Sequence, residues 1–194
     1  MIVDERLVTY INSLDTGNTE ILDQIEKEAI AAYVPIIRKE MQSFLKLLLA
    51  MQKPMRILEV GTAVGFSAIL MAQYAPADCK IVTIENYEKR IPVAKENFKR
   101  AGKDEQITLL EGDAMQILPT LSGEFDMIFM DAAKGQYINF MPDILRLLKS
   151  GGVLVSDNVL QDGDIIESHY VVERRNRTIS VSYTHLTLPT KLEV

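Results

Sequence analysis

Residues 56–67, RILEVGTAVGFS, constrain the fold of this chain more than any other stretch. The apolar run that starts the stretch is typical of a buried strand, and residues from Phe66 onward continue as a helical pattern. Between them, Gly61 and Gly65 allow the backbone to turn sharply and a ligand to approach it closely. This order of strand, glycine turn and helix predicts the ligand-binding unit of an α/β protein.

The glycine spacing restricts the kind of ligand. The G-x-G-x-x-G arrangement, which holds a pyrophosphate at a helix N-terminus, is absent from this turn. A nucleoside cofactor without phosphate groups fits better, and S-adenosylmethionine is such a cofactor. An ordinary α/β turn that binds no cofactor is the alternative.

The spacing of apolar residues differs between two parts of the chain. Residues 1–52 have helical spacing, and residues 53–158 alternate short apolar runs with helical patterns. Strands are expected at 56–60, 80–85, 107–111, 125–131 and 152–157, and helices at 66–74, 87–101, 114–121 and 136–149. Strands this apolar are covered on both faces, which predicts a parallel, doubly wound α/β sheet with N-terminal helices.

Composition excludes several classes of protein. The 194 residues, 47% apolar and 25% charged, are ordinary for one globular domain. The start has no basic leader followed by an apolar run, and no run approaches membrane length, so we expect a cytoplasmic protein without membrane association. A net charge of −6 disfavours broad nucleic-acid binding but leaves room for a local basic patch.

In a parallel sheet, ligands bind at the carboxyl ends of the strands. Three polar residues fall there or in the first turn that follows. Ser67 is placed to bond a carboxylate or a ribose, and Glu85 to accept hydrogen bonds from both ribose hydroxyls. Asp113 either caps the following helix or receives an adenine amino group.

A second group of strand-end residues suggests a metal. Asp131, Asp157 and Asn158 supply two carboxylates and an amide oxygen, the hard ligands that Mg²⁺ prefers. The alternative is that Asp157 and Asn158 form a polar turn and Asp131 caps a helix. Lys134 follows closely, where a dication and a sulfonium would lower its pKa enough for it to act as a base, although a lone lysine is usually solvated.

Three motifs together resemble the metal-dependent O-methyltransferase family that includes catechol and caffeoyl-coenzyme A methyltransferases. They are ILEVGT at 57–62, MDAAKGQY at 130–137 and DNVL at 157–160, and the resemblance covers about residues 1–180. It implies a Rossmann-like fold, a homodimer, Lys134 as the base, and Mg²⁺ or another divalent ion on Asp131, Asp157 and Asn158. The cofactor S-adenosylmethionine would be surrounded by Glu59, Gly61, Ser67, Glu85, Asp113, Ala114 and Asp131.

Two further segments, VPIIR at 34–38 and Gly163-Asp164, resemble a bacterial branch similar to tRNA 5-hydroxyuridine methyltransferase. This resemblance favours tRNA as the acceptor, and a small catechol-type molecule is the alternative. Both present two neighbouring oxygens to a metal. Contacts with RNA phosphates would come from Arg38, Arg174, Arg175 and Arg177; a solvated surface is the other interpretation of the last three.

Residues 181–194, VSYTHLTLPTKLEV, depart from the family. They are similar to translated adapter sequence and replace the helix and two strands with which the family completes its sheet. We therefore expect a methyltransferase domain at 1–180, a non-native tail at 181–194, and an exposed edge on the fifth strand. A genuine short tail with strand propensity is the alternative.

Overall fold

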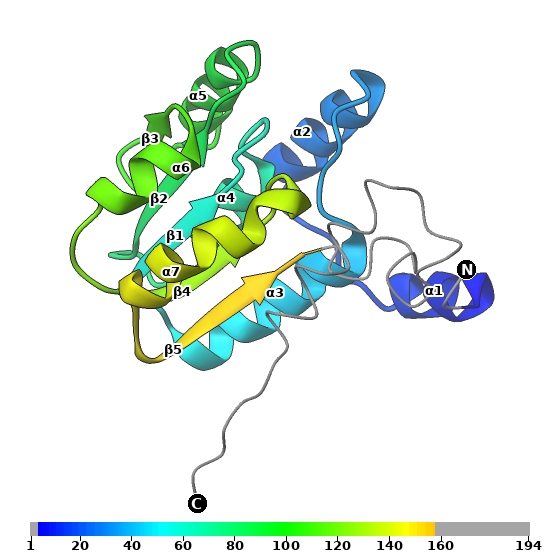
Figure 1. Ribbon diagram of the computed structural model, residues 1–194. Coiled ribbons are helices and arrows are strands. Elements are labelled where there is room, and N and C mark those ends of the chain that lie inside the picture. The colour runs from blue at the N-terminus through cyan, green and yellow to red at the C-terminus, as the bar shows by residue number, and fades with distance from the viewer. Residues whose placement is uncertain (1–3, 158–194) are drawn as a thin grey trace, which may run out of the picture.

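The computed structural model describes residues 4–157, which form five parallel strands in the order β3-β2-β1-β4-β5. This order confirms the doubly wound α/β sheet (Figure 1). The strands are β1 (Arg56–Val60), β2 (Lys80–Glu85), β3 (Ile107–Glu111), β4 (Phe125–Met130) and β5 (Leu148–Ser156).

Helices cover both faces of the sheet (Figure 1). Side chains alternate along β1, so that Ile57 packs with α2 to α5 and Leu58 packs with α7 on the opposite face. The helices are α1 (Glu5–Ser13), α2 (Glu20–Ala31), α3 (Lys39–Gln52), α4 (Phe66–Tyr74), α5 (Ile91–Arg100), α6 (Ala114–Ile117) and α7 (Tyr137–Leu147), with 3₁₀ turns η1 (Leu118–Thr120) and η2 (Lys134–Gln136). None of the helices within residues 4–157 has the length and apolarity needed to cross a membrane.

Some expected boundaries were wrong. β5 begins at Leu148 rather than at 152, because Leu148 already pairs with Phe125 before the register shifts near Gly151 and Gly152. α5 begins only at Ile91, where Pro92 occupies the first turn, and the expected helix 114–121 divides into α6 and η1. β4 ends at Met130, one residue before the expected end, and the helix expected over 136–149 is α7.

The strand order reverses between β1 and β4. The chain runs outward from β1 through β2 to β3, then returns to place β4 on the other side of β1. At the amino edge of this junction, Asp126 accepts hydrogen bonds from the backbone N–H groups of Met55 (2.9 Å) and Arg56 (3.0 Å). At the carboxyl edge, the reversal leaves a crevice of the kind that binds ligands in open α/β sheets.

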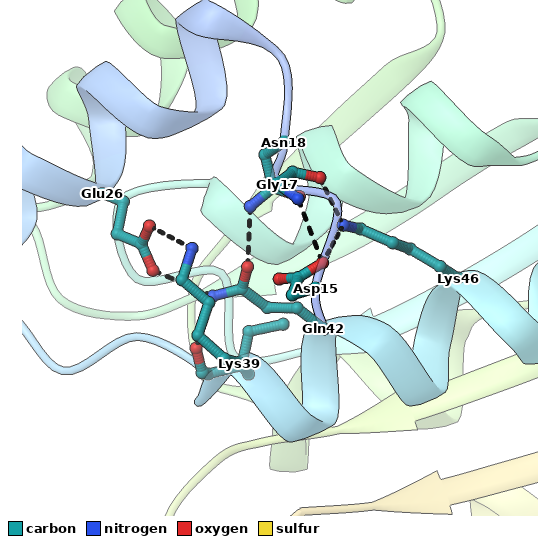
Figure 2. A network of polar contacts seen from close by, with 8 residues as sticks. Asp15, Gly17, Asn18, Glu26, Lys39, Gln42 and Lys46 are labelled. Atoms are coloured by element: carbon teal, nitrogen blue, oxygen red, sulfur yellow. Dashed lines mark hydrogen bonds and ion pairs between the residues drawn. The ribbon is translucent and has the colours of Figure 1, made fainter. Parts of the chain in front are cut away.

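A buried amide holds the N-terminal helices together beside this crevice. Figure 2 shows Gln42 of α3 among the polar side chains of the preceding segments. Its Nε2 donates to Glu26 Oε1 and to the Ile37 carbonyl, both at 3.0 Å, and its Oε1 accepts from Asn18 Nδ2 at 2.7 Å. Lys39 adds an ion pair of 2.7 Å to Glu26. The segment around Ile37 is thereby fixed to α2 and α3.

We expect Gln42→Ala to lower the free energy of unfolding by about 2–4 kcal/mol, because it leaves buried polar partners without hydrogen bonds. Urea denaturation, monitored by circular dichroism, measures this loss of stability. Gln52→Ala, at an exposed position of the same helix, is the matched control and should change stability by less than about 0.5 kcal/mol. Equal effects of the two substitutions would contradict the role assigned to Gln42.

Candidate active site

The loop between β1 and α4 has an unusual backbone. Gly61, Ala63 and Gly65 all have positive φ, at 105°, 47° and 86°. A Cβ on Gly61 would clash with the backbone carbonyl of Asp131, and a Cβ on Gly65 would lie 2.5 Å from Phe98 Cε1. Glycine is therefore required at both positions by conformation and by space.

Two cavities meet at this loop. The first, of about 310 Å³, is bounded by residues 35–37 and the loop, and Ser67 lies on its wall. The second, of about 480 Å³, extends past Glu85 towards Asp113 and Ala114. The residues common to both walls are Gly61, Ala63, Arg90, Asp131 and Ala132. The sequence-predicted residues Gly61, Ser67, Glu85, Asp113, Ala114 and Asp131 are thus brought together around one joined space.

Glu85 is held by backbone donors. Its Oε2 accepts the Ala63 N–H at 2.7 Å, and its Oε1 accepts the N–H groups of Asn86 (3.0 Å) and Tyr87 (2.8 Å). These three bonds connect the ends of β1 and β2 and fix the carboxylate on the wall of the second cavity. Ala63 donates its hydrogen bond to Glu85 from a left-handed backbone conformation.

Asp113 is the N-cap of α6. Its Oδ1 accepts the Met115 N–H at 2.9 Å, so the capping role that the sequence left open is present in the structure. The same residue lines the second cavity together with Ala114 and Met115. Capping occupies one carboxylate oxygen and orients the side chain at the cavity wall.

Glu59 lies beneath the loop and is fully buried. It accepts hydrogen bonds from the hydroxyls of Ser67 and Thr83, each at 2.5 Å, and Thr83 in turn lies 2.6 Å from the hydroxyl of Thr62. Burial raises the pKa of Glu59 to about 7, against the opposing effect of the two hydroxyl donors. Neither cavity includes Glu59 in its wall, so this residue reaches the joined space through Ser67.

Two aspartates follow the adjacent strands β4 and β5 at the carboxyl edge of the sheet; Asp131 lines both cavities and Asp157 lines neither. The backbone N–H of Asp131 donates to the Val60 carbonyl at 3.0 Å, and that of Asp157 donates to the Met130 carbonyl at 2.9 Å. The charges of both carboxylates act on the hydroxyl of Tyr137, whose pKa is raised chiefly by burial and further by these neighbours. Two oxygen donors at adjacent strand ends fit the preference of Mg²⁺.

The metal prediction is only partly within the structure. Within residues 4–157, no cluster of three or more His, Cys, Asp or Glu side chains could hold a metal ion. The predicted third ligand, Asn158, lies outside the described residues, as do Gly163, Asp164, Arg174, Arg175, Arg177 and the segment 181–194. Lys134 begins the short turn η2 after Asp131. Arg38 is exposed and precedes α3, next to the residues that bound the first cavity.

Three residues of the site were not found from the sequence. Thr83 pairs in register with Glu59 across β1 and β2, and its position two residues before Glu85 places both on one face. Arg90 lies just before α5 with its guanidinium 5.2 Å from the centre of the Tyr87 ring. The buried hydroxyl of Tyr137 donates to the Met130 carbonyl (2.9 Å) and accepts the Ala132 N–H (3.2 Å). The alternation along β2 was the signal available for Thr83, and Tyr137 ends the 130–137 motif, although its contacts could not be predicted from that motif.

The sequence is similar to a family of enzymes. A family model described as O-methyltransferase matches residues 12–188, past the expected boundary at residue 180. A catechol O-methyltransferase of Niastella koreensis is 39% identical over 130 residues, which are 65% of this chain and 59% of that protein. A catechol O-methyltransferase of Mycobacterium tuberculosis is 35% identical over 160 residues, which are 81% of this chain and 73% of that protein.

Solved structures share the fold. An O-methyltransferase from Bacillus cereus, in complex with SAH, superposes with a TM-score of 0.82 at 27% identity and covers 94% of this chain and 85% of its own. The O-methyltransferase TomG from Streptomyces achromogenes, involved in tomaymycin synthesis and in complex with SAM, gives a TM-score of 0.82 at 29% identity, with 97% and 87% covered.

We expect Gly61→Ala to lower the free energy of unfolding by about 3 kcal/mol or more, since the new Cβ meets the Asp131 backbone at a positive φ. Thermal and urea unfolding measure the effect. Gly135→Ala is the matched control, because a Cβ there contacts nothing within 4 Å. A stable Gly61→Ala protein would show that the two strand ends separate easily.

Proposed function

Because the chain belongs to the O-methyltransferase family, we propose that it transfers the methyl group of S-adenosylmethionine to a hydroxyl of a small catechol-type acceptor in the presence of a divalent metal. The observation that carries this proposal is the position of Asp131, which lies on the wall shared by both cavities. A methyl donor extending through the two cavities would pass this residue. An acceptor held there would meet the donor near its middle.

The proposed orientation of the cofactor follows from the polar residues that line each cavity. The second cavity offers the Glu85 carboxylate to ribose hydroxyls and Asp113 to an adenine amino group. The first cavity offers the Ser67 hydroxyl and the loop backbone to the amino acid end. Alignment of the acceptor oxygen with the methyl carbon and the sulfur is then the main contribution of the protein to the rate.

Asp131, Asp157 and Asn158 would hold the divalent ion. When bound, such an ion supplies Lewis acidity that lowers the pKa of an acceptor hydroxyl. Tyr137 positions this edge of the site, because its hydroxyl bridges the Met130 carbonyl and the Ala132 N–H on either side of Asp131. Lys134, three residues after Asp131, is the proposed base for the acceptor proton.

The catechol-type acceptor is favoured because the two relatives described above are both catechol O-methyltransferases. 5-Hydroxyuridine in tRNA is the second candidate, because it also presents neighbouring oxygens and because the exposed Arg38 lies beside the residues that bound the first cavity. Labelled methyl transfer from S-adenosylmethionine to a catechol and to hydroxyuridine-containing tRNA, offered in parallel, distinguishes them. Label in tRNA alone would overturn the catechol proposal. The homodimer and the cytoplasmic location remain predictions.

We expect Asp157→Ala to reduce methyl transfer to background, because it removes one proposed metal ligand. The labelled-methyl assay with Mg²⁺, and with excess chelator, measures the loss. Asp78→Ala is the control: Asp78 is exposed and precedes β2 at the opposite edge of the sheet. Unchanged turnover of Asp157→Ala, or full activity in chelator, would remove the metal from the proposal.

Lys134→Met should lower kcat by about 10²–10⁴-fold with little change in cofactor affinity, as expected for loss of a general base. Steady-state kinetics and equilibrium binding of S-adenosylhomocysteine separate the two effects. Lys27→Met, at an exposed position of α2, provides the control. A loss of cofactor affinity with kcat intact would assign Lys134 a binding role instead.

A further inference from the structure

The hydroxyl of Ser67 belongs to two environments. Ser67 lies on the wall of the first cavity, and its hydroxyl donates its single proton to Oε1 of the buried Glu59, with 2.5 Å between the two oxygens. A serine hydroxyl has one hydrogen, so a proton given to Glu59 is not available to a ligand. The bond to Glu59 therefore decides whether Ser67 can act as a donor towards the cavity.

The surroundings of Ser67 favour an anionic ligand group. Ser67 lies in the first turn of α4, a nine-residue helix whose N-terminus carries partial positive charge. Arg90 carries the only positive charge among the described residues that line the two cavities, and it lines the first cavity together with the acidic Asp131, a pair that suits the carboxylate and the amino group of an amino acid. Under the proposed function, the carboxylate of the amino acid end of S-adenosylmethionine is the group that this end of the cavity would receive.

We propose that binding of the cofactor carboxylate at Ser67 is coupled to the uptake of one proton by Glu59. The protonated Glu59 donates to Ser67 Oγ, and the Ser67 hydroxyl then turns to donate to the carboxylate. The only covalent change is a new O–H bond on Glu59; its proton comes from solvent and is taken up by those molecules in which Glu59 is ionised before the cofactor binds. Glu59 is thus a positioning residue that acts through Ser67, and this inference rests on the proposed function.

The other partners of Glu59 are compatible with a neutral side chain. Thr83 gives its proton to Oε2 of Glu59, so Thr62 is the donor in the Thr62 to Thr83 bond. The bond from Thr83 to Glu59 persists when Glu59 is protonated, because the new proton is on Oε1 and faces Ser67. The charged groups acting on Glu59 are Asp131 after β4 and Glu85 at the end of β2, and both favour its neutral form. These two charges add to the effect of full burial, and the pKa of Glu59 is raised to about 7.

The sign of the pH dependence follows from this arrangement. A bound carboxylate withdraws the Ser67 proton and adds negative charge nearby, so it raises the pKa of Glu59 further. Cofactor binding is then strongest at a pH where Glu59 is already protonated. It weakens as the pH rises above the pKa of Glu59 in the free protein. We expect the dissociation constant for S-adenosylhomocysteine to increase about tenfold between about pH 6 and about pH 8.

Isothermal titration calorimetry of the full chain with S-adenosylhomocysteine tests the proposal. Titrations at about pH 7 in buffers of different ionisation enthalpy should give an uptake of about 0.5 proton per cofactor. Glu59→Gln, whose amide supplies a permanent donor to Ser67, should bind with no proton uptake and with a pH-independent affinity. 5′-Methylthioadenosine, which lacks the carboxylate, should bind the unaltered protein without proton uptake.

The outcomes separate this inference from the proposed function. Binding of S-adenosylhomocysteine without proton uptake would overturn the coupling alone, and uptake that persists in Glu59→Gln would assign the proton to the cofactor amino group. Failure of the unaltered chain to bind S-adenosylhomocysteine would overturn the proposed function itself. Should Glu59→Gln unfold, as shown by circular dichroism, Ser67→Ala provides the second test: it should bind more weakly and without proton uptake.

Discussion

The close backbone contact between Gly61 and Asp131 is the constraint on which the rest of the site depends. It joins the ends of β1 and β4 where the strand order reverses, and no side chain can be accommodated between them. Because the two backbones meet there, Asp131 lies on the wall of both cavities. The proposed cofactor loop and the proposed metal edge therefore meet at one close backbone contact, which would keep the reacting groups aligned under the proposed function.

The buried acids of the site differ in the donors that surround them. Glu85 accepts three backbone N–H groups, which cannot rotate away and which hold the side chain in one position. Glu59 accepts two hydroxyls, and the Ser67 hydroxyl can reverse its direction and serve as the acceptor when the acid is neutral, while Thr83 continues to donate. The hydroxyl donors, together with full burial, distinguish Glu59, for which we propose proton exchange, from Glu85, the proposed ligand for ribose hydroxyls.

The sequence predicted the sheet well because apolar runs identify buried parallel strands directly. The runs 56–60, 80–85 and 107–111 coincide with β1, β2 and β3. It failed at the start of β5, where pairing already begins at Leu148, ahead of two glycines that interrupt the apolar pattern. Thr83, Arg90 and Tyr137 were missed because their roles depend on register and on contacts between distant segments. The roles of Asn158 and of Arg174, Arg175 and Arg177 remain predictions.

The pairing of β1 with β4 also has a consequence for the order in which the protein can assemble during its synthesis. Asp126, which accepts the N–H groups of Met55 and Arg56, follows them in the chain by 71 and 70 residues. On the ribosome, β1, β2 and β3 emerge with one side of β1 unpaired until β4 is made. This β1 edge is an aggregation hazard for the nascent chain, and its protection must await the second half of the sheet.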